Sequence, residues 1–404
     1  LVNTDEESFF YPSIGLSGII SEMVKLPEFI SYLKVRGSYT EVGNSYGRFM
    51  TTVTYPYDEQ TQSWTSTSSY PNTKLKPERT KSWEVGLDAR ILNDISLNLT
   101  YYRSNTYNQT FYADLSLSSG YSNIPIQSGN IMNEGLEMSL GYNKQWKDFS
   151  FNTNYTLTWN KNRVKRLADG VYNYATGQPI QMPELSPLTY GHTDARLILR
   201  VGGSMGDVYG QRLLKRDLNG YILNEEGVGL AMENKETYLG SILPKMNMGW
   251  SLGFGYKGVN LGMTFTGRFG GIVISETQSV LDAAGVSKVS ADVRDAGGVQ
   301  INQSKVSAQT YYQTIQGTAA YYTYSATNVR LGELSLSYTL PKKWFDNKVG
   351  MTVGLVGKNL WMIYCKAPFD PELTTSAASN FYQGFDAYML PSTRNFGFNV
   401  KFQF

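Results

Sequence analysis

Few residues of this chain combine a type and a spacing that could perform chemistry. The 404 residues include one histidine, His192, and one cysteine, Cys365. No serine or cysteine nucleophile stands at a matching spacing from His192, and a single cysteine forms no internal disulfide. A histidine–cysteine metal site needs several such residues at short spacing. We therefore expect no catalytic constellation, no metal site and no cofactor, and a protein that is not an enzyme.

One polar segment carries oxygen ligands at spacings similar to those of a calcium loop. These residues are Asp217, Asn219 and Glu225. The turn glycine and the bidentate glutamate that such a loop needs do not align with them. The neighbouring pair Glu225 and Glu226 gives no acid–base geometry. A polar turn is therefore the better interpretation.

Aromatic side chains are stronger candidates for function, because they make up 14% of the chain and gather in its polar connecting segments. Flat rings with a polar tip are suited to stacking on sugars or peptides, and equally to contacting a protein lid. The candidates for a surface that faces substrate or lid are Trp64, Tyr70, Tyr311, Tyr312, Tyr321, Tyr322, Phe381, Tyr382 and Phe385. The alternative is that loops of this length bury such rings to become ordered.

Composition excludes several other classes of protein. Charged residues make up 17% of the chain, whereas soluble domains average about 25%. The net charge of +2 indicates neither a nucleic-acid-binding stripe nor an acidic tail, so we expect no nucleic-acid partner. The chain begins at Leu1 without a signal peptide and has no apolar run of about 18 residues. We expect a mature or truncated chain without a transmembrane helix.

The elements that position these residues are strands, because apolar and polar residues alternate with a period of two. At the C-terminus Phe396, Phe398, Val400, Phe402 and Phe404 alternate with Asn395, Gly397, Asn399, Lys401 and Gln403. Hairpins with short turns are predicted for 83–91 with 95–101, 136–142 with 149–159, 250–256 with 259–265, and 334–340 with 349–355. Further strands are expected near 11–20 and 31–40.

Short turns alternate with long polar connections, predicted at 41–79, 105–127, 164–194, 218–245, 269–326 and 361–388. Long strands of this kind fit either a membrane-spanning barrel or a soluble sandwich. We favour the barrel, because a closed barrel satisfies its backbone groups in hydrocarbon and because aromatic residues gather at the strand ends. The fold class predicted is all-β, an antiparallel transmembrane barrel with long extracellular loops and short periplasmic turns.

Because successive strands of an antiparallel barrel alternate in direction, we expect two further wall strands at 195–201 and 207–214. The expected count is then thirteen. Complete bacterial barrels have an even number of strands, so the strands near 11–20 and 389–404 should pair with strands outside these 404 residues. Apolar positions change from odd to even between Leu331 and Leu334, which predicts a β-bulge at Gly332. The C-terminal phenylalanines should face lipid and Lys401 the lumen.

Six phrases, in this order, resemble the barrel of SusC/RagA-type TonB-dependent outer-membrane transporters. They are residues 33–44 (LKVRGSYTEVGN), 75–88 (LKPERTKSWEVGLD), 133–137 (NEGLE), 206–210 (GDVYG), 325–341 (SATNVRLGELSLSYTLP) and 391–404. The resemblance covers nearly the whole chain. Residues 217–221 are shorter than the family's acidic segment, and 361–366 are atypical.

The resemblance implies a barrel of about 22 strands with an N-terminal plug. It implies that residues 1–404 are the C-terminal portion of the barrel, about thirteen strands, without the plug and first strands. It further implies a Gram-negative outer membrane, import of oligosaccharides or peptides powered by TonB through the absent plug, and a SusD-like surface lipoprotein. The expected partners are thus outer-membrane lipids, the remaining barrel and plug, TonB, the lipoprotein and the substrate. A passive porin or membrane anchor, and a soluble β-rich binding protein, are the alternatives.

Overall fold

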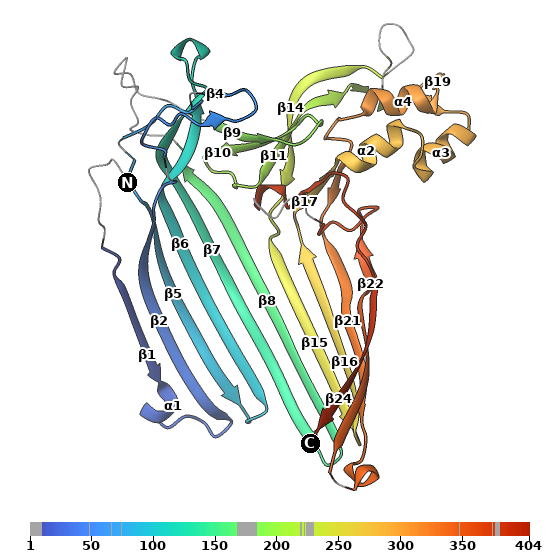
Figure 1. Ribbon diagram of the computed structural model, residues 1–404. Coiled ribbons are helices and arrows are strands. Elements are labelled where there is room, and N and C mark those ends of the chain that lie inside the picture. Colours follow the sequence, from blue (N-terminus) through green and yellow to red (C-terminus); the bar gives the residue numbers. More distant parts are fainter. Residues whose placement is uncertain are drawn as a thin grey trace.

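The computed structural model describes residues 10–47, 49–65, 67–73, 75–167, 184–218, 220–221, 223, 230–346, 348–373, 375 and 380–404. Its main element is a tall antiparallel sheet of 11 strands, here called the wall (Figure 1). In order across the sheet these strands are β1 (Ser13–Ile19), β2 (Ile30–Asn44), β5 (Glu78–Ile91), β6 (Ile95–Asp114), β7 (Asn123–Trp146), β8 (Phe149–Arg166), β15 (Met246–Tyr256), β16 (Val259–Phe269), β21 (Asn328–Thr339), β22 (Gly350–Cys365) and β24 (Asn395–Gln403).

Tight turns join the wall strands at the lower end in Figure 1, as the sequence predicts. Leu92 and Asn93 lie between β5 and β6 with φ of +53° and +60°. Lys257 and Gly258 lie between β15 and β16 with φ of +46° and +89°. Positive φ at both central positions gives a turn whose twist matches that of the flanking strands. All four predicted hairpins are present.

The wall has two chemically different faces, because neighbouring strands pair in a register that keeps apolar residues in rows. Phe398 pairs with Leu355, Leu355 with Leu336, and Leu336 with Leu261. The alternate positions pair Asn399 with Gly354 and Ser337 with Gly354. Directly opposite residues share a face. We call these the apolar face and the polar face.

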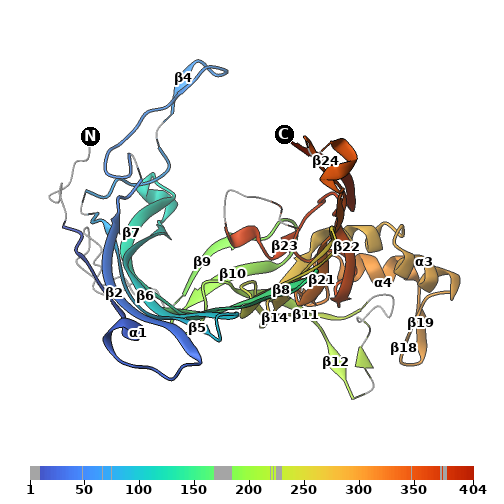
Figure 2. The same ribbon diagram turned by 90° about the horizontal axis from the view of Figure 1, so that it is seen from below.

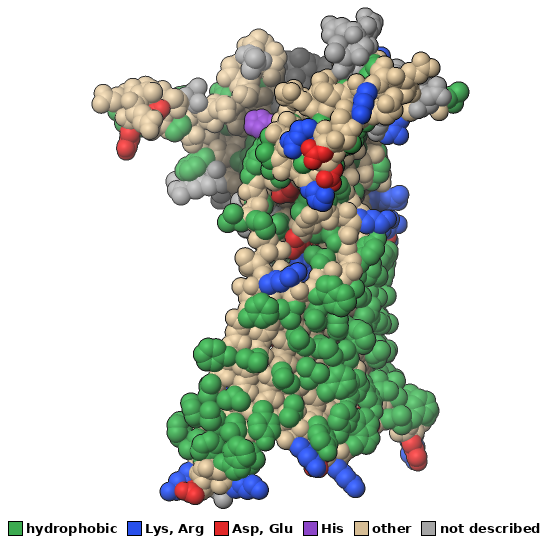
Figure 3. All heavy atoms as spheres, turned by 90° about the vertical axis from the view of Figure 1, so that its right-hand side faces the viewer, with side chains coloured by type: hydrophobic (Ala, Val, Ile, Leu, Met, Phe, Trp, Pro, Cys, Tyr) green, Lys and Arg blue, Asp and Glu red, His purple; other side chains and the backbone are tan. Residues whose placement is uncertain are grey.

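The predicted alternation of the last strand is confirmed. Val400 and Phe402 pair with Val353 and Met351 on the apolar face, whereas Lys401 pairs with Thr352 on the polar face. Figure 3 shows hydrophobic side chains gathered over the lower part of the strands, with Lys and Arg below them at the turns. β24 is exposed along its whole length.

The number of wall strands is a correction. Residues 195–201 and 207–214 do form a hairpin, β10 (Ala195–Arg200) and β11 (Asp207–Leu214), but it belongs to a separate four-stranded sheet. β8 pairs directly with β15, for example Tyr155 with Trp250, so the wall has 11 strands rather than thirteen. As antiparallel neighbours, β8 and β15 already run in opposite directions. The alternation of strand directions therefore does not require two more strands between them.

The two outermost wall strands each have one neighbour. β1 pairs with β2 alone and β24 with β22 alone, so the described wall is an open sheet. Viewed from below, it curves from β1 and β2 on one side to β22 and β24 on the other (Figure 2). An unpaired edge carries free backbone donors and acceptors, which is unfavourable unless another strand covers it.

The predicted bulge at Gly332 is confirmed. Thr264 pairs with Glu333 and Phe265 with Leu331, so Gly332 is the extra residue of β21. Opposite it, β22 also breaks register, and Asn359 adopts a left-handed φ of +54°. Gly332 does not belong to the glycines with positive φ, so this bulge does not use the conformation that we expected of it.

The segments at the upper end in Figure 1 form a folded layer, here called the loop layer. Its strands are β3 (Tyr57–Asp58) with β4 (Ser63–Trp64); β14 (Met232–Ser241), β11, β10 and β9 (Glu184–Thr189); β12 (Arg216–Asp217) with β13 (Gly220–Tyr221); β20 (Thr323–Ser325), β17 (Ile272–Ser275) and β23 (Phe385–Asp386); and β18 (Val299–Ile301) with β19 (Ser304–Val306). Its helices are α2 (Glu276–Ala283), α3 (Lys288–Asp295), α4 (Ala308–Ile315) and the 3-10 turns η1 (Leu117–Ser119) and η3 (Asn380–Tyr382), while α1 (Ile20–Met23) and η2 (Lys342–Phe345) lie at the turns below.

Serine caps explain where the three larger helices begin. Ser275, Ser287 and Ser307 precede α2, α3 and α4, and each accepts a hydrogen bond from a backbone N–H three residues ahead. Such a cap satisfies one of the free donors of the first turn. No helix within the described residues is both long and apolar enough to cross a membrane.

The connection predicted at 105–127 is mostly strand. β6 continues to Asp114 and β7 begins at Asn123, giving strands of 20 and 24 residues. A span of about 9–11 residues suffices to cross a bilayer as a tilted strand. β6 and β7 therefore extend beyond the wall into the loop layer.

Candidate substrate-facing surfaces

The polar face of the wall is its concave face. Val164 of β8 shares this face with Asn160 and Asn162 by alternation, and it is buried in a core together with Tyr190 and Phe385. Phe385 belongs to β23, which lies on the concave side of the curved wall in Figure 2. Any solute inside the curve of the wall therefore meets the polar face.

A charged cluster stands on this face near the first wall strands. Arg36 donates from Nη1 to both carboxylate oxygens of Asp88 at 3.0 and 2.9 Å and from Nη2 to Thr100. Asn98 also donates to Asp88. Gly86 stands opposite Arg36, and a Cβ there would lie 2.6 Å from the guanidinium Nε. The glycine thus makes room for an arginine–carboxylate pair whose polar atoms line the concave surface.

The loop layer packs around a buried cluster that we call the central loop core. Tyr190 is fully buried there, and its phenol oxygen donates to the carbonyl of Phe381 at 2.6 Å. Its ring lies 5.0 Å from that of Phe385 and 6.2 Å from that of Tyr382. Burial raises the pKa of Tyr190, so the phenol stays neutral. Other members are Phe111, Ile126, Ile131, Val164, Leu197, Leu199, Val208 and Ile274.

A second cluster, the helical loop core, is built mainly by α4 and its neighbours. Tyr311, Tyr312, Ile315 and Tyr322 are all buried in it. The rings of Tyr311 and Tyr312 meet edge-on at 5.1 Å, and those of Tyr321 and Tyr322 at 5.0 Å. Burial raises the pKa of Tyr312 to about 12. These rings serve the packing of the loop layer.

The nine aromatic candidates therefore divide into two groups. Trp64, at 71% exposed, and Tyr70, at 44%, present rings to solvent. Trp64 packs against Tyr57 across the β3–β4 hairpin at 5.1 Å, and Tyr70 meets Tyr121 edge-on at 5.1 Å. The buried or core-packed candidates are Tyr311, Tyr312, Tyr321, Tyr322, Phe381, Tyr382 and Phe385. Of these seven, Tyr311, Tyr312, Tyr322 and Phe385 are buried, whereas Tyr321, Phe381 and Tyr382 are half-buried at the margins of the cores.

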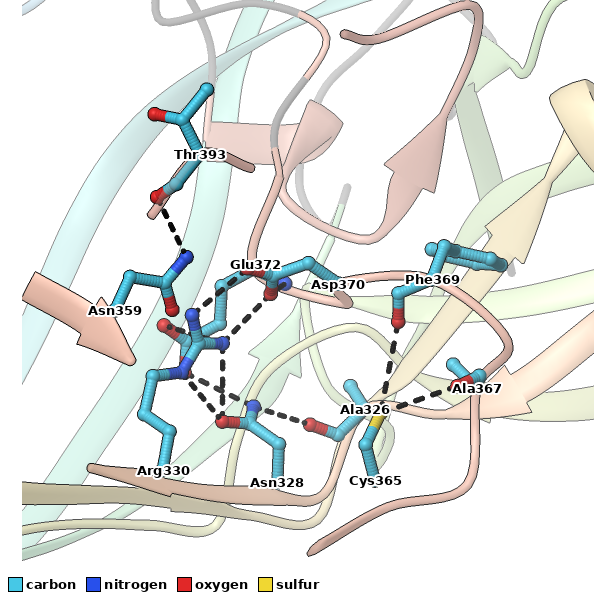
Figure 4. Close-up of polar contacts among 10 residues, drawn as sticks. All are labelled: Ala326, Asn328, Arg330, Asn359, Cys365, Ala367, Phe369, Asp370, Glu372 and Thr393. Carbon is cyan, nitrogen blue, oxygen red and sulfur yellow. Dashed lines mark hydrogen bonds and ion pairs between the residues drawn. The ribbon is translucent and has the colours of Figure 1, made fainter. Parts of the chain in front are cut away.

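A buried ion pair that the sequence reasoning missed fastens the segment after β22 to β21 (Figure 4). Arg330 donates to Asp370 at 2.9 and 2.7 Å, with side-chain exposures of 11% and 8%. Arg330 also lies 3.3 Å from Glu372 and donates to Asn328 Oδ1 at 3.2 and 3.3 Å. The Arg330 guanidinium is thus held on two sides. The sequence did contain a signal for this pair. Arg330 stands in a strand with alternating apolar residues, and a buried charge there needs a partner of opposite charge.

The electrostatics of this pair favour the ionised carboxylate. Burial alone would raise the pKa of Asp370, but hydrogen bonds from Arg330 and from the backbone N–H of Glu372 outweigh burial and lower that pKa. The thiol of Cys365 lies nearby, donating to the carbonyls of Ala367 at 3.4 Å and Phe369 at 3.7 Å. Cys365 is thus a half-buried thiol held against two backbone carbonyls.

The residues first considered for catalysis form no reactive arrangement among the described residues. The backbone N–H of His192 donates to Glu276 at 3.3 Å, a contact that orders a turn. No group of three or more metal-ligating side chains is present in the described ranges. Asn219, Glu225 and Glu226 lie outside the described residues, as does the side chain of Asp217.

The architecture now defines a class of protein. A curved antiparallel wall with one apolar and one polar face, tight turns at one end and a folded loop layer at the other is the arrangement of outer-membrane β-barrels. The chain belongs to the TonB-dependent receptor-like β-barrel family, whose sequence model matches residues 2–360. The family resemblance of the sequence phrases is confirmed.

Relatives and solved structures agree with this assignment. TonB-dependent receptor P3 of Formosa agariphila is 25% identical over 432 aligned residues, which cover 97% of this chain and 42% of that receptor. TonB-dependent receptor SusC of Bacteroides thetaiotaomicron is 28% identical over 119 residues, covering 29% of this chain and 12% of SusC. The RagAB peptide importer in its open-open state superposes with a TM-score of 0.72 at 19% identity, covering 99% of this chain and 43% of that chain. This chain thus spans about two-fifths of the length of receptor P3 and of the importer chain.

Proposed function

We propose that these 404 residues form the C-terminal portion of the barrel of a TonB-dependent transporter in the outer membrane of a Gram-negative bacterium. The match to relatives of more than twice the length supports a larger receptor that also contains a plug and further strands. The open edges of β1 and β24 support the same view, because each leaves a row of backbone groups to be paired.

The two-faced wall is the observation that carries the proposal. The apolar face, with Leu355 and Phe398 exposed at 64% and 81%, is suited to lipid. The concave polar face, with the Arg36–Asp88 pair, is suited to a wet lumen or to a plug. The tight turns then lie in the periplasm and the loop layer outside the cell.

The cargo that we propose is a large nutrient, an oligosaccharide or a peptide, taken up with a SusD-like surface lipoprotein. Likeness to proteins named SusC and RagAB peptide importer supports this class of cargo and partner. A passive porin or a membrane anchor is the second candidate, because the wall alone would serve either function. A soluble β-rich binding protein would have to cover the apolar face with another sheet, and no such cover lies over Leu355 or Phe398 among the described residues.

Leu355→Arg in the full-length receptor should reduce insertion into the outer membrane, because the charge would enter lipid at a cost of about 2–4 kcal/mol near the midplane. Val356→Arg is the matched control, since the next residue stands at the same height on the polar face. Fractionation and the yield of folded receptor measure both variants. Equal yields would show that the apolar face does not meet lipid.

Uptake of oligosaccharides or peptides should depend on TonB and be lost in cells that lack it. Uptake that persists without TonB would favour the porin.

Within the same assay, Trp64→Ala should weaken substrate or lipoprotein binding by about 1–2 kcal/mol, because an exposed ring is removed without disturbing a core. Trp344→Ala, at the turn end and 62% exposed, is the control. Deletion of residues 311–324 would instead remove the helical loop core and is a poor test of contact.

A further inference from the structure

A hollow of about 500 Å³ opens where β8 changes its neighbour. Lower on β8, the N–H of Asn160 donates to the carbonyl of Lys245, next to β15. Higher on β8, the N–H of Val164 donates to the carbonyl of Gly203, and the N–H of Gly202 donates back to Val164. Residues 161–163 lie between these two partners, and they line the hollow.

The two cations of this stretch stand on the apolar side of the wall. Lys161 and Arg163 alternate with Asn160 and Asn162, so they share the face of Trp159. Trp159 pairs with Met246, which pairs with Phe269, and this is the top row of the apolar face. The cations therefore stand immediately above that row. A solute passing along the concave face would not meet them.

The charge around the hollow is predominantly positive. Lys161, Arg163 and Lys245 line it, against a single carboxylate, that of Asp207, among its described lining residues. Asp207 already accepts from the N–H of Ser204 at 2.8 Å and from the phenol of Tyr238 at 3.2 Å.

The cations themselves are only weakly neutralised. The ammonium of Lys161 lies 3.6 Å from Glu134 and is 52% exposed, and Arg163 Nε donates to the carbonyl of Gly202 at 3.3 Å. The hollow therefore keeps positive charge and donors for an anion.

We propose that this hollow binds the phosphate of an outer-leaflet lipid headgroup. The inference rests on the proposed outer-membrane location, which places the top of the apolar face at the headgroup level. Lysine and arginine form short charge-assisted hydrogen bonds to phosphate. The acyl chains would lie along the apolar row of Trp159 and Met246, while Tyr238, 55% exposed, offers an amphipathic ring beside the headgroup.

The test uses full-length receptor purified in detergent and stripped of lipid. The probes are bisphosphorylated lipid A, the same lipid without phosphates, and inorganic phosphate, with binding followed by native mass spectrometry. The variant Lys161→Gln with Arg163→Gln should bind the phosphorylated lipid at least tenfold more weakly. The control Lys147→Gln with Lys257→Gln removes two lysines at the turns of the opposite end and should bind as the parent does.

A gain of affinity gives a second readout that misfolding cannot mimic. Glu134→Gln removes the carboxylate beside Lys161 and should strengthen binding of the phosphorylated lipid a few-fold. Equal binding by parent and double variant, equal binding of the lipid without phosphates, or inorganic phosphate binding as tightly as the lipid would each overturn the proposal. Parent receptor found outside the outer membrane on fractionation would overturn the proposed function as well, whereas these binding outcomes alone would not.

Discussion

Replacing Arg330 with methionine in the full-length receptor should loosen the segment after β22 by about 3–5 kcal/mol, because Asp370 would be left buried without its counter-ion. Hydrogen exchange across residues 366–373 measures this local opening. Lys358→Met is the matched control, since it removes an exposed lysine, 62% accessible, that lies 3.6 Å from Glu333. Exposed pairs contribute about 0–1 kcal/mol. Equal exchange in both variants would contradict a structural role for the buried pair.

The same pair should make this segment acid-sensitive. The folded pKa of Asp370 is lowered relative to the unfolded chain, so its stabilising contribution is fully present above the unfolded pKa of about 4. It is lost as the pH falls through the lower folded pKa, where the carboxylate takes up a proton. Because acid itself slows amide exchange, the quantity to compare is protection, the exchange rate relative to that of an unstructured peptide at the same pH. Protection across 366–373 should fall with acid in the parent, and it should fall less in Asp370→Asn, which has no such carboxylate to protonate.

Tyr190→Ala should destabilise the loop layer by about 3–5 kcal/mol, because a fully buried ring is removed from the central loop core. Tyr190→Phe should cost about 1–2 kcal/mol, since it keeps the ring and removes the donor to the Phe381 carbonyl. Protease sensitivity of the loop layer and denaturant unfolding measure the two steps. Tyr55→Ala, at a tyrosine that is 61% exposed, is the control.

The loss of stability should be largest in Tyr190→Ala, smaller in Tyr190→Phe and smallest in the control Tyr55→Ala. Any other order would show that the central loop core is not what holds the loop layer together. Insertion into the outer membrane should be unaffected in all three variants, because none of the substituted side chains belongs to the wall. Loss of insertion in Tyr190→Ala would mean that the wall depends on the loop layer.

The wall was predictable because its information is local. Alternation along Trp83 to Ile91 and Ile95 to Tyr101 indicates strands, faces and the turn between them without knowledge of any distant residue. The bulge at Gly332 was visible for the same reason, as a change of phase within a few residues. What the pattern did not provide was the hydrogen-bonding neighbour of β8, which is a contact between segments far apart in the sequence.

The loop layer was not predictable because its contacts are distant. Phe111, Tyr190 and Phe385 come together in one core from segments that share no periodic pattern. The hairpin at 195–201 and 207–214 alternates poorly because Leu197, Ile198 and Leu199 are all buried, which removes the polar half of the pattern. The aromatic candidates show the same limit, since composition alone does not distinguish exposed Trp64 from buried Tyr322.

The strict alternation of the wall has an evolutionary consequence. One residue inserted into a wall strand would move every side chain beyond it to the opposite face, so most insertions and deletions there would be eliminated by selection. The alignment with the Formosa receptor spans 432 positions for a chain of 404 residues, so gaps must exist, and they are expected between the strands. The bulge at Gly332 shows what an extra residue in a wall strand requires, a local break in register that is matched on the neighbouring strand by Asn359 in a left-handed conformation. The outer loops of such receptors can therefore change in length and structure during evolution while the number of wall strands stays the same.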